Sequence, residues 1–279
     1  DVRSHQTPLD RSQMTGEDLR LEFQFLALDE DATDTGSSIK TKDNVDEPQR
    51  ELRRVIARNN AQIEHRLWDE LHPEAPPVVY YIAGNHIEFD TITNETLVVG
   101  NGELLLRDPR QPTIATHQSA LAGRGATRFT WDEKLQTTKL SEQLYRIEMN
   151  GNVQMLHKGL DDSIGMLTSD TLEAIAIDPI ATPSGEKGVS QLTLGGMDLQ
   201  QLKAMGSVYV ATETRRVDCD VFDYNLVTGF AKLHADPNRS ISIVTEGTPY
   251  PVRATSIIWN MDPFIDTITI RDLQVSSPN

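Results

Sequence analysis

GNVQM, at residues 151–155, is one of four copies of a short pattern that decides the fold class. The other copies read NNAQI at 59–63, GNGEL at 100–104 and GSVYV at 206–210. Each copy begins with Gly or Asn, the residues that tolerate positive φ best, so each predicts a bend or bulge at the start of a strand. The alternation that follows turns one set of side chains inward. His65 and His157 follow the first and third copies.

Further segments between the copies alternate with the same period of two, and most of the chain therefore reads as strand. The starts of the four copies are 41, 51 and 55 residues apart. This spacing is too irregular for a solenoid with a fixed coil, so loops of variable length must separate the copies. The predicted fold class is all-β, with an antiparallel sheet of repeated hairpins.

Residues 50–71 are ambiguous, because Leu52, Val55, Ile56, Ile63 and Leu67 could also line a helix. We favour a strand from Ile56 onward, since the copy at 59–63 interrupts the helical spacing. A helical turn before Ile56 stays open.

The chain divides into three predicted regions. Residues 1–50 hold an N-terminal strand and an acidic loop of the same fold, and 51–165 and 166–279 form two repeat regions. Residues 14–19 (MTGEDL) and 167–172 (LTSDTL) open alike, which suggests a larger duplication. Residues 29–48 and 179–190 are rich in polar, Gly and Pro residues and predict exposed loops.

Composition limits the possible partners of this chain of 279 residues. The formal net charge of −16 would repel phosphates, so we expect no nucleic acid partner. The same charge is unfavourable for a phosphorylated glycolipid unless divalent cations bridge the charges or the protein holds only the acyl part. No apolar run is long enough to span a bilayer. The chain begins with Asp1, and we expect a mature form or an excised fragment.

Two stretches share an order of features that resembles a known family. Residues 88–100 (EFDTITNETLVVG) and 221–233 (VFDYNLVTGFAKL) each read as a strand, an Asp, a turn with Thr and Asn or Gly, and a second strand. Asp, Asn and Gly suit such turns. This order resembles the repeat of the OstA-like proteins, which include periplasmic and membrane-anchored components of lipopolysaccharide transport. The chain differs from the small bridge proteins of that family in its length and its acidic insertions.

The resemblance implies a folded-over antiparallel sheet, called a β-taco or β-jellyroll, whose apolar slot holds acyl chains. It also implies a periplasmic or otherwise extracytoplasmic location and edge-to-edge contacts with itself or other envelope proteins by strand addition. Nine alternating apolar residues are candidates for the slot lining, although ordinary core packing is the simpler explanation for any one of them. They are Phe89, Leu104, Leu106, Phe129, Trp131, Ile147, Met149, Met155 and Trp259.

The sequence offers no catalytic or metal constellation, and we predict no enzyme, no metal and no cofactor. Residues 29–36 resemble a calcium loop, but Lys40 stands where an EF-hand has its bidentate Glu. The histidines lack metal-ligand spacing. Cys219 alternates with Val217 and Val221, which predicts a buried structural thiol.

Three functions remain open at this point. The first is binding or transport of lipopolysaccharide or a related amphiphile in the cell envelope. The second is a ligand-free structural or protein-interaction module of a larger envelope protein. The third and weakest is a β-helical carbohydrate-active enzyme.

Overall fold

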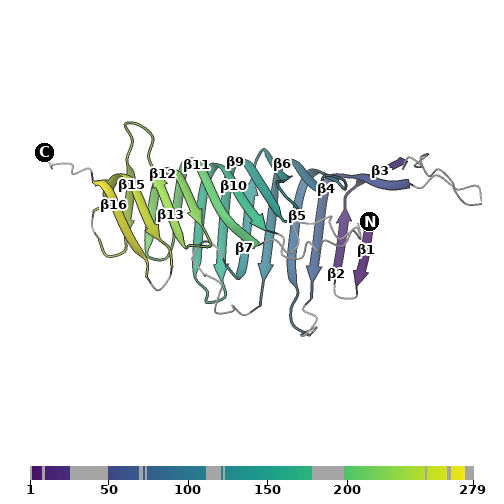
Figure 1. The fold of residues 1–279 in the computed structure, drawn as a ribbon, viewed down its shortest axis with the longest axis horizontal. Helices are drawn as coiled ribbons and strands as arrows, with labels where there is room; N and C mark the ends of the chain where they lie inside the picture. Colours follow the sequence, from purple (N-terminus) through teal and green to yellow (C-terminus); the bar gives the residue numbers. More distant parts are fainter. Residues whose placement is uncertain are drawn as a thin grey trace, which may run out of the picture.

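A computed structural model describes residues 2–7, 10–25, 50–68, 72, 74–110, 121, 123–177, 198–248, 250–262 and 265–273. These residues contain sixteen strands and no helix, and the strands form one antiparallel sheet (Figure 1). The prediction of an all-β, folded-over antiparallel sheet is confirmed. The loops predicted at 29–48 and 179–190, and the calcium-like segment at 29–36, lie outside these residues. The strands are β1 (Val2–Thr7), β2 (Asp10–Thr15), β3 (Asp18–Phe25), β4 (Arg50–Leu67), β5 (Val78–Asp90), β6 (Glu95–Asp108), β7 (Gly125–Trp131), β8 (Lys134–Lys139), β9 (Leu144–Gly159), β10 (Ile164–Ile177), β11 (Asp198–Ala211), β12 (Arg215–Asn225), β13 (Phe230–His234), β14 (Ile241–Thr245), β15 (Val252–Asn260) and β16 (Thr267–Leu273).

Three pairs of short strands interrupt the series of long strands along the sheet. β2 and β3 both pair with β4, β7 and β8 both lie between β6 and β9, and β13 and β14 both lie between β12 and β15. Each short pair therefore occupies the place of one long strand that is interrupted in its middle. The strands follow one another in nearly their order in the chain, so the sheet consists of successive hairpins.

A line of bulges and breaks runs across the middle of these strands, and we call it the crease. Its members are Gly16–Glu17, Asn59–Asn60, Gly84–Asn85, Gly100–Asn101, Asp132–Glu133, Gly151–Asn152, Ser169–Asp170 and Gly206–Ser207. The backbone joins neighbouring members: the Asp132 amide donates to the Gly151 carbonyl at 2.8 Å, and the Gly100 amide donates to the Glu133 carbonyl at 2.6 Å. All four repeat copies lie on this line.

The four copies have the predicted backbone conformation, but their predicted position at the start of a strand is wrong. Asn59 and Asn60 have φ of 56° and 53°, and Gly151 and Asn152 have φ of 84° and 44°. Each pair lies inside a long strand, because the neighbouring strands keep hydrogen bonds on both sides of the bulge. A bulge increases the local bend of a strand, and bulges aligned across many strands fold the whole sheet.

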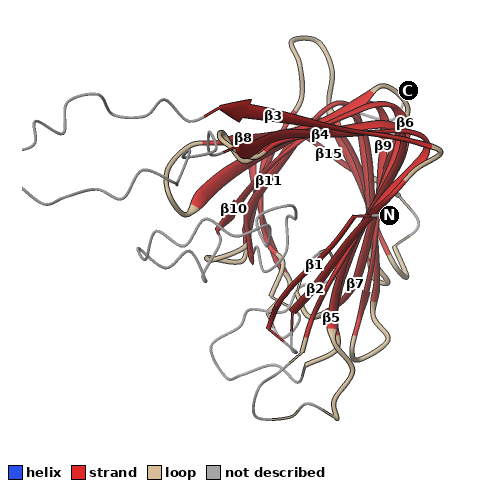
Figure 2. Ribbon diagram, turned by 90° about the vertical axis from the view of Figure 1, so that its right-hand side faces the viewer, coloured by secondary structure: helices blue, strands red, loops and turns tan. Residues whose placement is uncertain are grey.

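The crease divides the sheet into two wings, which face each other across a common interior. In the view along the long axis, β3 and β8 lie on one side and β1, β2 and β7 on the other (Figure 2). The first wing comprises β3, β8, β13, β16 and residues 50–58, 86–90, 95–99, 144–150, 171–177, 198–205, 221–225 and 256–260. The second wing comprises β1, β2, β7, β14 and residues 61–67, 78–84, 102–108, 153–159, 164–169, 208–211, 215–219 and 252–254.

Buried apolar side chains run in continuous rows along both wings, because paired residues of neighbouring strands point to the same face. One row of the first wing contains Ala57, Ile87, Val98, Leu135, Met149, Leu172, Ala204, Phe222, Leu233 and Ile257. One row of the second wing contains Met14, Ile63, Ile82, Leu104, Phe129, Met155, Leu167, Val210, Val217 and Ile243. Both rows belong to one core cluster that runs the length of the sheet.

The expected boundary at residues 165 and 166 falls inside β10. β10 pairs with both β9 and β11, so sheet and core continue across it. The two similar segments at 14–19 and 167–172 occupy equivalent places: both cross the crease, with Met14 and Leu167 in the row of the second wing.

Residues 50–67 form strand throughout, so the helical alternative, including a turn before Ile56, is wrong. The bulge at Asn59 and Asn60 explains the ambiguity. It shifts the alternation of the core positions, which are Val55 and Ala57 before it and Ala61 and Ile63 after it, and Ile56 is buried as well. Read without the break, this spacing imitates a helix.

Both turns that carry the family resemblance are hairpin turns. Asp90 Oδ1 accepts hydrogen bonds from the amides of Ile92 at 2.9 Å and Thr93 at 3.1 Å, and Asn94 has φ of 58°. In the second turn Asn225 takes the accepting role, and Gly229 has φ of 74°. These contacts fix the turns between β5 and β6 and between β12 and β13.

Candidate functional site

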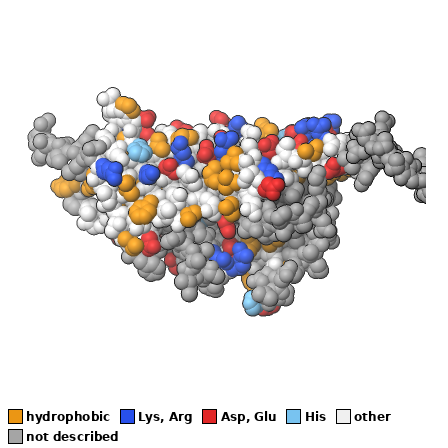
Figure 3. Space-filling view, viewed as in Figure 1, with side chains coloured by type: hydrophobic (Ala, Val, Ile, Leu, Met, Phe, Trp, Pro, Cys, Tyr) orange, Lys and Arg blue, Asp and Glu red, His pale blue; other side chains and the backbone are white. Residues whose placement is uncertain are grey.

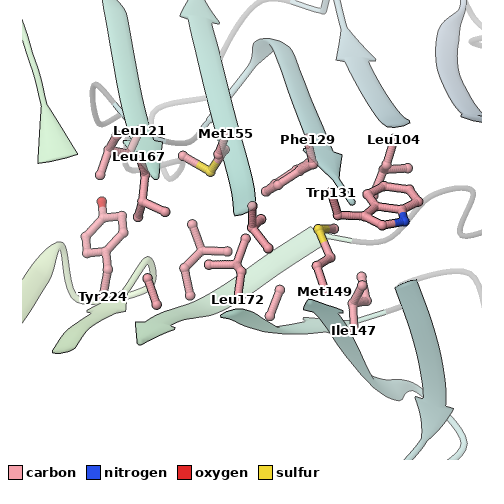
Figure 4. Packing of buried hydrophobic residues seen from close by; sticks show 14 of the residues in the cluster. Leu104, Leu121, Phe129, Trp131, Ile147, Met149, Met155, Leu167, Leu172 and Tyr224 are labelled. Carbon is pink, nitrogen blue, oxygen red and sulfur yellow. The ribbon is translucent and has the colours of Figure 1, made fainter. Parts of the chain in front are cut away.

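The nine slot candidates all lie in the interior between the wings. Eight of them are fully buried, with at most 3% of the side-chain surface exposed, and Leu106 is partly buried against the same cluster. Figure 4 shows Leu104, Phe129, Trp131, Ile147, Met149 and Met155 gathered in this interior. Burial alone does not separate a lining residue from a core residue.

Five of the nine surround one pocket, and this position distinguishes them from the four candidates that lie elsewhere in the core. Its lining consists of Leu104, Leu106, Phe129, Ile147 and Met149, together with Ala174 and Leu199. Every lining side chain is apolar. The empty space amounts to about 310 Å³, part of which is open to solvent. The pocket is narrow, because about one water-sized sphere fits between its lining atoms.

Both wings contribute to the pocket. Leu104, Leu106 and Phe129 come from the second wing, on β6 and β7. The remaining four come from the first wing, on β9, β10 and β11. The pocket therefore lies where the two wings face each other, and its width depends on how far apart the wings stand.

Sequence reasoning missed Ala174 and Leu199 for different reasons. Ala174 alternates with Leu172 and Ala176, so its inward position was readable, but its small side chain drew no attention. Leu199 precedes a register shift between β10 and β11, which breaks the alternation that would have marked it as inward.

Trp131 and Trp259 are buried but do not line the pocket. The Trp131 Nε1 donates a hydrogen bond to the Gly100 carbonyl at 3.1 Å, and its ring fills the space that a Cβ on Gly102 would need. The Trp259 Nε1 donates to Asp266 Oδ1 at 2.8 Å. These contacts give both rings a structural role: Trp131 packs at the crease, and Trp259 packs near the C-terminal end of the sheet.

Leu121, in the connection between β6 and β7, is an interior residue that the sequence did not reveal. Its side chain is fully buried. Figure 4 shows it beside Leu167. A loop residue thus fills part of the space between the wings.

The pocket is bordered by charged groups. Asp108 follows Leu106 by two residues on β6 and accepts two hydrogen bonds from the Arg110 guanidinium, at 2.8 and 2.7 Å. Arg124 Nη1 lies 3.6 Å from Asp108 Oδ2. Asp198 adjoins Leu199 at the start of β11. Charged residues from both wings therefore lie at the strand ends beyond the lining residues.

Two histidines and the cysteine are also buried, and His157 lies two strands from the lining residue Leu106 in the same row. Burial lowers the pKa of His65 and of His157 from 6.5 to about 4. Burial, followed by the charges of Asp220 and Asp218, raises the pKa of Cys219 to about 12. A thiol with such a pKa is a poor nucleophile at neutral pH. The prediction that Cys219 is buried is confirmed.

No group of three or more His, Cys, Asp or Glu side chains in the described ranges is arranged to hold a metal ion. None of those ranges contains a helix that is long and apolar enough to cross a membrane.

Comparison with known proteins assigns no family: no protein-family model, curated protein or solved structure matches the chain. The resemblance to the OstA-like proteins therefore rests on the turn and strand pattern of the sequence.

Proposed function

We propose that this chain binds an amphiphile, in the manner of the lipopolysaccharide-transport proteins that it resembles, by holding an acyl chain between the two wings. The observation that carries this proposal is the pocket, because its seven lining side chains are all apolar and come from both wings. Ligand pockets are commonly apolar clefts with a few polar groups at their border. Lipopolysaccharide or a related amphiphile is the ligand class that we propose.

The narrowness of the pocket implies that the wings must move apart to admit a chain. The strands pair within each wing and across the crease, so opening at the crease separates side-chain contacts between the wings and breaks no strand pair. The small volume thus describes a closed state, and binding stabilises an open one.

Binding of a fluorescent fatty acid to delipidated protein tests the proposal. The protein is unfolded in guanidinium chloride, washed with detergent, refolded and titrated with dansyl-undecanoic acid. We expect saturable binding to the wild type and strongly weakened binding to Leu106→Glu and Leu199→Glu, which place a charge at the pocket. Both residues are only partly buried, so these variants retain most of the core.

Leu156→Glu is the matched control. Leu156 lies on β9 and is 48% exposed on the outer face, so the same change there should leave binding intact. Equal binding by all four proteins, or no binding by the wild type, would contradict the proposal.

A second function, a structural module without a ligand, is favoured by how tightly the interior is closed. Arg215 in the second wing pairs with Asp266, beside Trp259 of the first wing, at 3.1 Å. This pair joins the wings near the C-terminal end. A protein that stays folded but binds no acyl probe after delipidation would support this alternative.

We further propose an extracytoplasmic location and edge-to-edge contacts with copies of this chain or with other envelope proteins. Among the described strands, β1 and β3 lie at one end of the sheet and β16 at the other, so strand addition could extend it at either end. On the face shown in Figure 3, hydrophobic side chains lie in small groups among charged ones, which offers no broad apolar surface for another mode of contact. Sedimentation that shows only monomers, with proline substitutions in β1 having no effect on any complex, would exclude this mode.

A further inference from the structure

The pocket border contains charges that the apolar lining does not explain. On β6, Leu104, Leu106 and Asp108 alternate on the inward side, so Asp108 continues the lining row toward the end of the strand. On β11, Asp198 directly precedes the lining residue Leu199. The charged border thus extends the pocket outward from both wings.

Arg124 is the unusual member of this border. Its side chain is only 18% exposed, and within the described ranges Asp108 is the one carboxylate at ion-pair distance, 3.6 Å away. Arg110, by contrast, is 47% exposed and holds Asp108 with two hydrogen bonds. A guanidinium carries five N–H donors. No Arg124 nitrogen is among the buried side-chain atoms of the described residues that lack a partner, so its remaining donors are accessible at the edge of the apolar pocket.

Electrostatic effects connect these groups across the two wings. Burial raises the pKa of Asp108, but the hydrogen bonds and charge of Arg110 and the charge of Arg124 outweigh it, and the pKa is lowered overall. Asp198 is exposed at the surface, but the protein around it partly desolvates the carboxyl group and raises its pKa; Arg110 and Arg124 oppose the increase, and Asp108 adds to it. The four groups are thus close enough to influence one another.

We infer that Arg124, assisted by Arg110, binds the anionic headgroup of a single-chain amphiphile whose tail occupies the pocket. This inference rests on the proposed function, and it names the charge of the ligand and the residues that recognise it. It also explains how a chain with a net charge of −16 accepts an anion. Guanidinium groups suit phosphate and carboxylate oxygens, and a site that is mostly removed from water strengthens the attraction.

Displacement of a neutral probe separates the headgroup from the tail. The delipidated full chain is loaded with N-phenyl-naphthylamine, which carries no charge, and then titrated with dodecyl phosphate or with dodecanol. We expect dodecyl phosphate to displace the probe at a concentration about tenfold lower than dodecanol, equivalent to one charge-assisted contact. Added salt should reduce this difference.

Three variants locate the effect. Arg124→Gln should weaken displacement of the probe by dodecyl phosphate about tenfold and leave displacement by dodecanol unchanged. Asp108→Asn frees both guanidinium groups and keeps an acceptor for the Arg110 amide. This variant should therefore make dodecyl phosphate displace the probe at a lower concentration. Arg128→Gln is the matched control, because it removes an equal charge from β7 where Arg128 pairs with Glu103 on the outer face.

The possible failures are distinguishable. Equal displacement by dodecyl phosphate and dodecanol, or equal losses in Arg124→Gln and Arg128→Gln, would overturn the headgroup site while probe binding still supports the proposed function. Absence of probe binding to the wild type would overturn the proposed function and this inference together.

Discussion

His65 and His157 lie in the same inward-facing row of the second wing, each six residues after the first residue of its repeat copy. Each ring is hydrogen-bonded through Nδ1 to a hydroxyl of the paired strand, His65 to Ser12 at 2.7 Å and His157 to Thr127 at 2.8 Å. The repeat therefore extends beyond backbone conformation to a polar pair in the interior.

These histidines predict a loss of stability in acid. Burial lowers both pKa values to about 4, so the unfolded chain, with a pKa near 6.5, binds protons first as the pH falls. The free energy of unfolding is therefore undiminished above pH 6.5, where both imidazoles are neutral in either state. It falls as the pH drops from about 6.5 to 4, by about 3 kcal/mol for each histidine. Urea unfolding at several pH values measures it.

The variant His65→Gln/His157→Gln should show a shallower pH dependence across this window. His72→Gln is the control, because His72 is exposed and should leave the slope unchanged. An equal slope in the double variant and the wild type would contradict the assignment.

The crease predicts that Gly151 tolerates no side chain. Its φ is 84°, and an added Cβ would lie 2.6 Å from Glu133 Cγ and 2.9 Å from the Glu133 backbone nitrogen. We expect Gly151→Ala to lower the free energy of unfolding by about 2 kcal/mol or more, combining backbone strain with the clash.

Gly229→Ala separates these two causes. Gly229 has a similar φ of 74°, but its added Cβ would have no neighbour closer than 3.7 Å. We expect a loss of about 1 kcal/mol, from backbone strain alone. Equal losses in thermal or urea unfolding would show that the close approach at the crease is unimportant.

The pocket predicts unequal effects for two similar substitutions in the core. Ala174 lines the pocket, which is partly open, so Ala174→Leu should cost less stability than the same change in the packed core, and it should abolish acyl-probe binding. Ala204 is fully buried in a packed row away from the lining, so Ala204→Leu should cost about 1–3 kcal/mol. Urea unfolding with probe titration tests both, and equal destabilisation would mean that the space beside Ala174 is already filled.

Much of the fold was readable from the sequence, because alternation and positive-φ residues are local properties. The four copies located the crease, and eight of the nine candidates are fully buried. The middle-of-strand position of the bulges depends on pairing with distant strands, which the local sequence does not contain. The same pairing hid Leu199 behind a register shift and brought Arg124 to Asp108. Leu121 reaches the interior from a connection that carries no alternation.

Cys219 predicts slow thiol chemistry in the folded protein. Its pKa is raised to about 12 by burial, so at pH 8 only a very small fraction is thiolate. A thiol reagent such as dithionitrobenzoate should label it only on unfolding, and labelling in native buffer at the rate of an exposed cysteine would contradict its burial between the wings.

The most direct test of the central claim maps where an acyl chain contacts the protein. Delipidated protein is irradiated with a diazirine-labelled fatty acid, and the modified residues are identified by fragment mass spectrometry. An acyl chain between the wings predicts saturable adducts on the lining residues, such as Leu106, Phe129 and Leu199. Adducts confined to outer-face residues such as Leu156, or adducts that an unlabelled fatty acid fails to suppress, would contradict it.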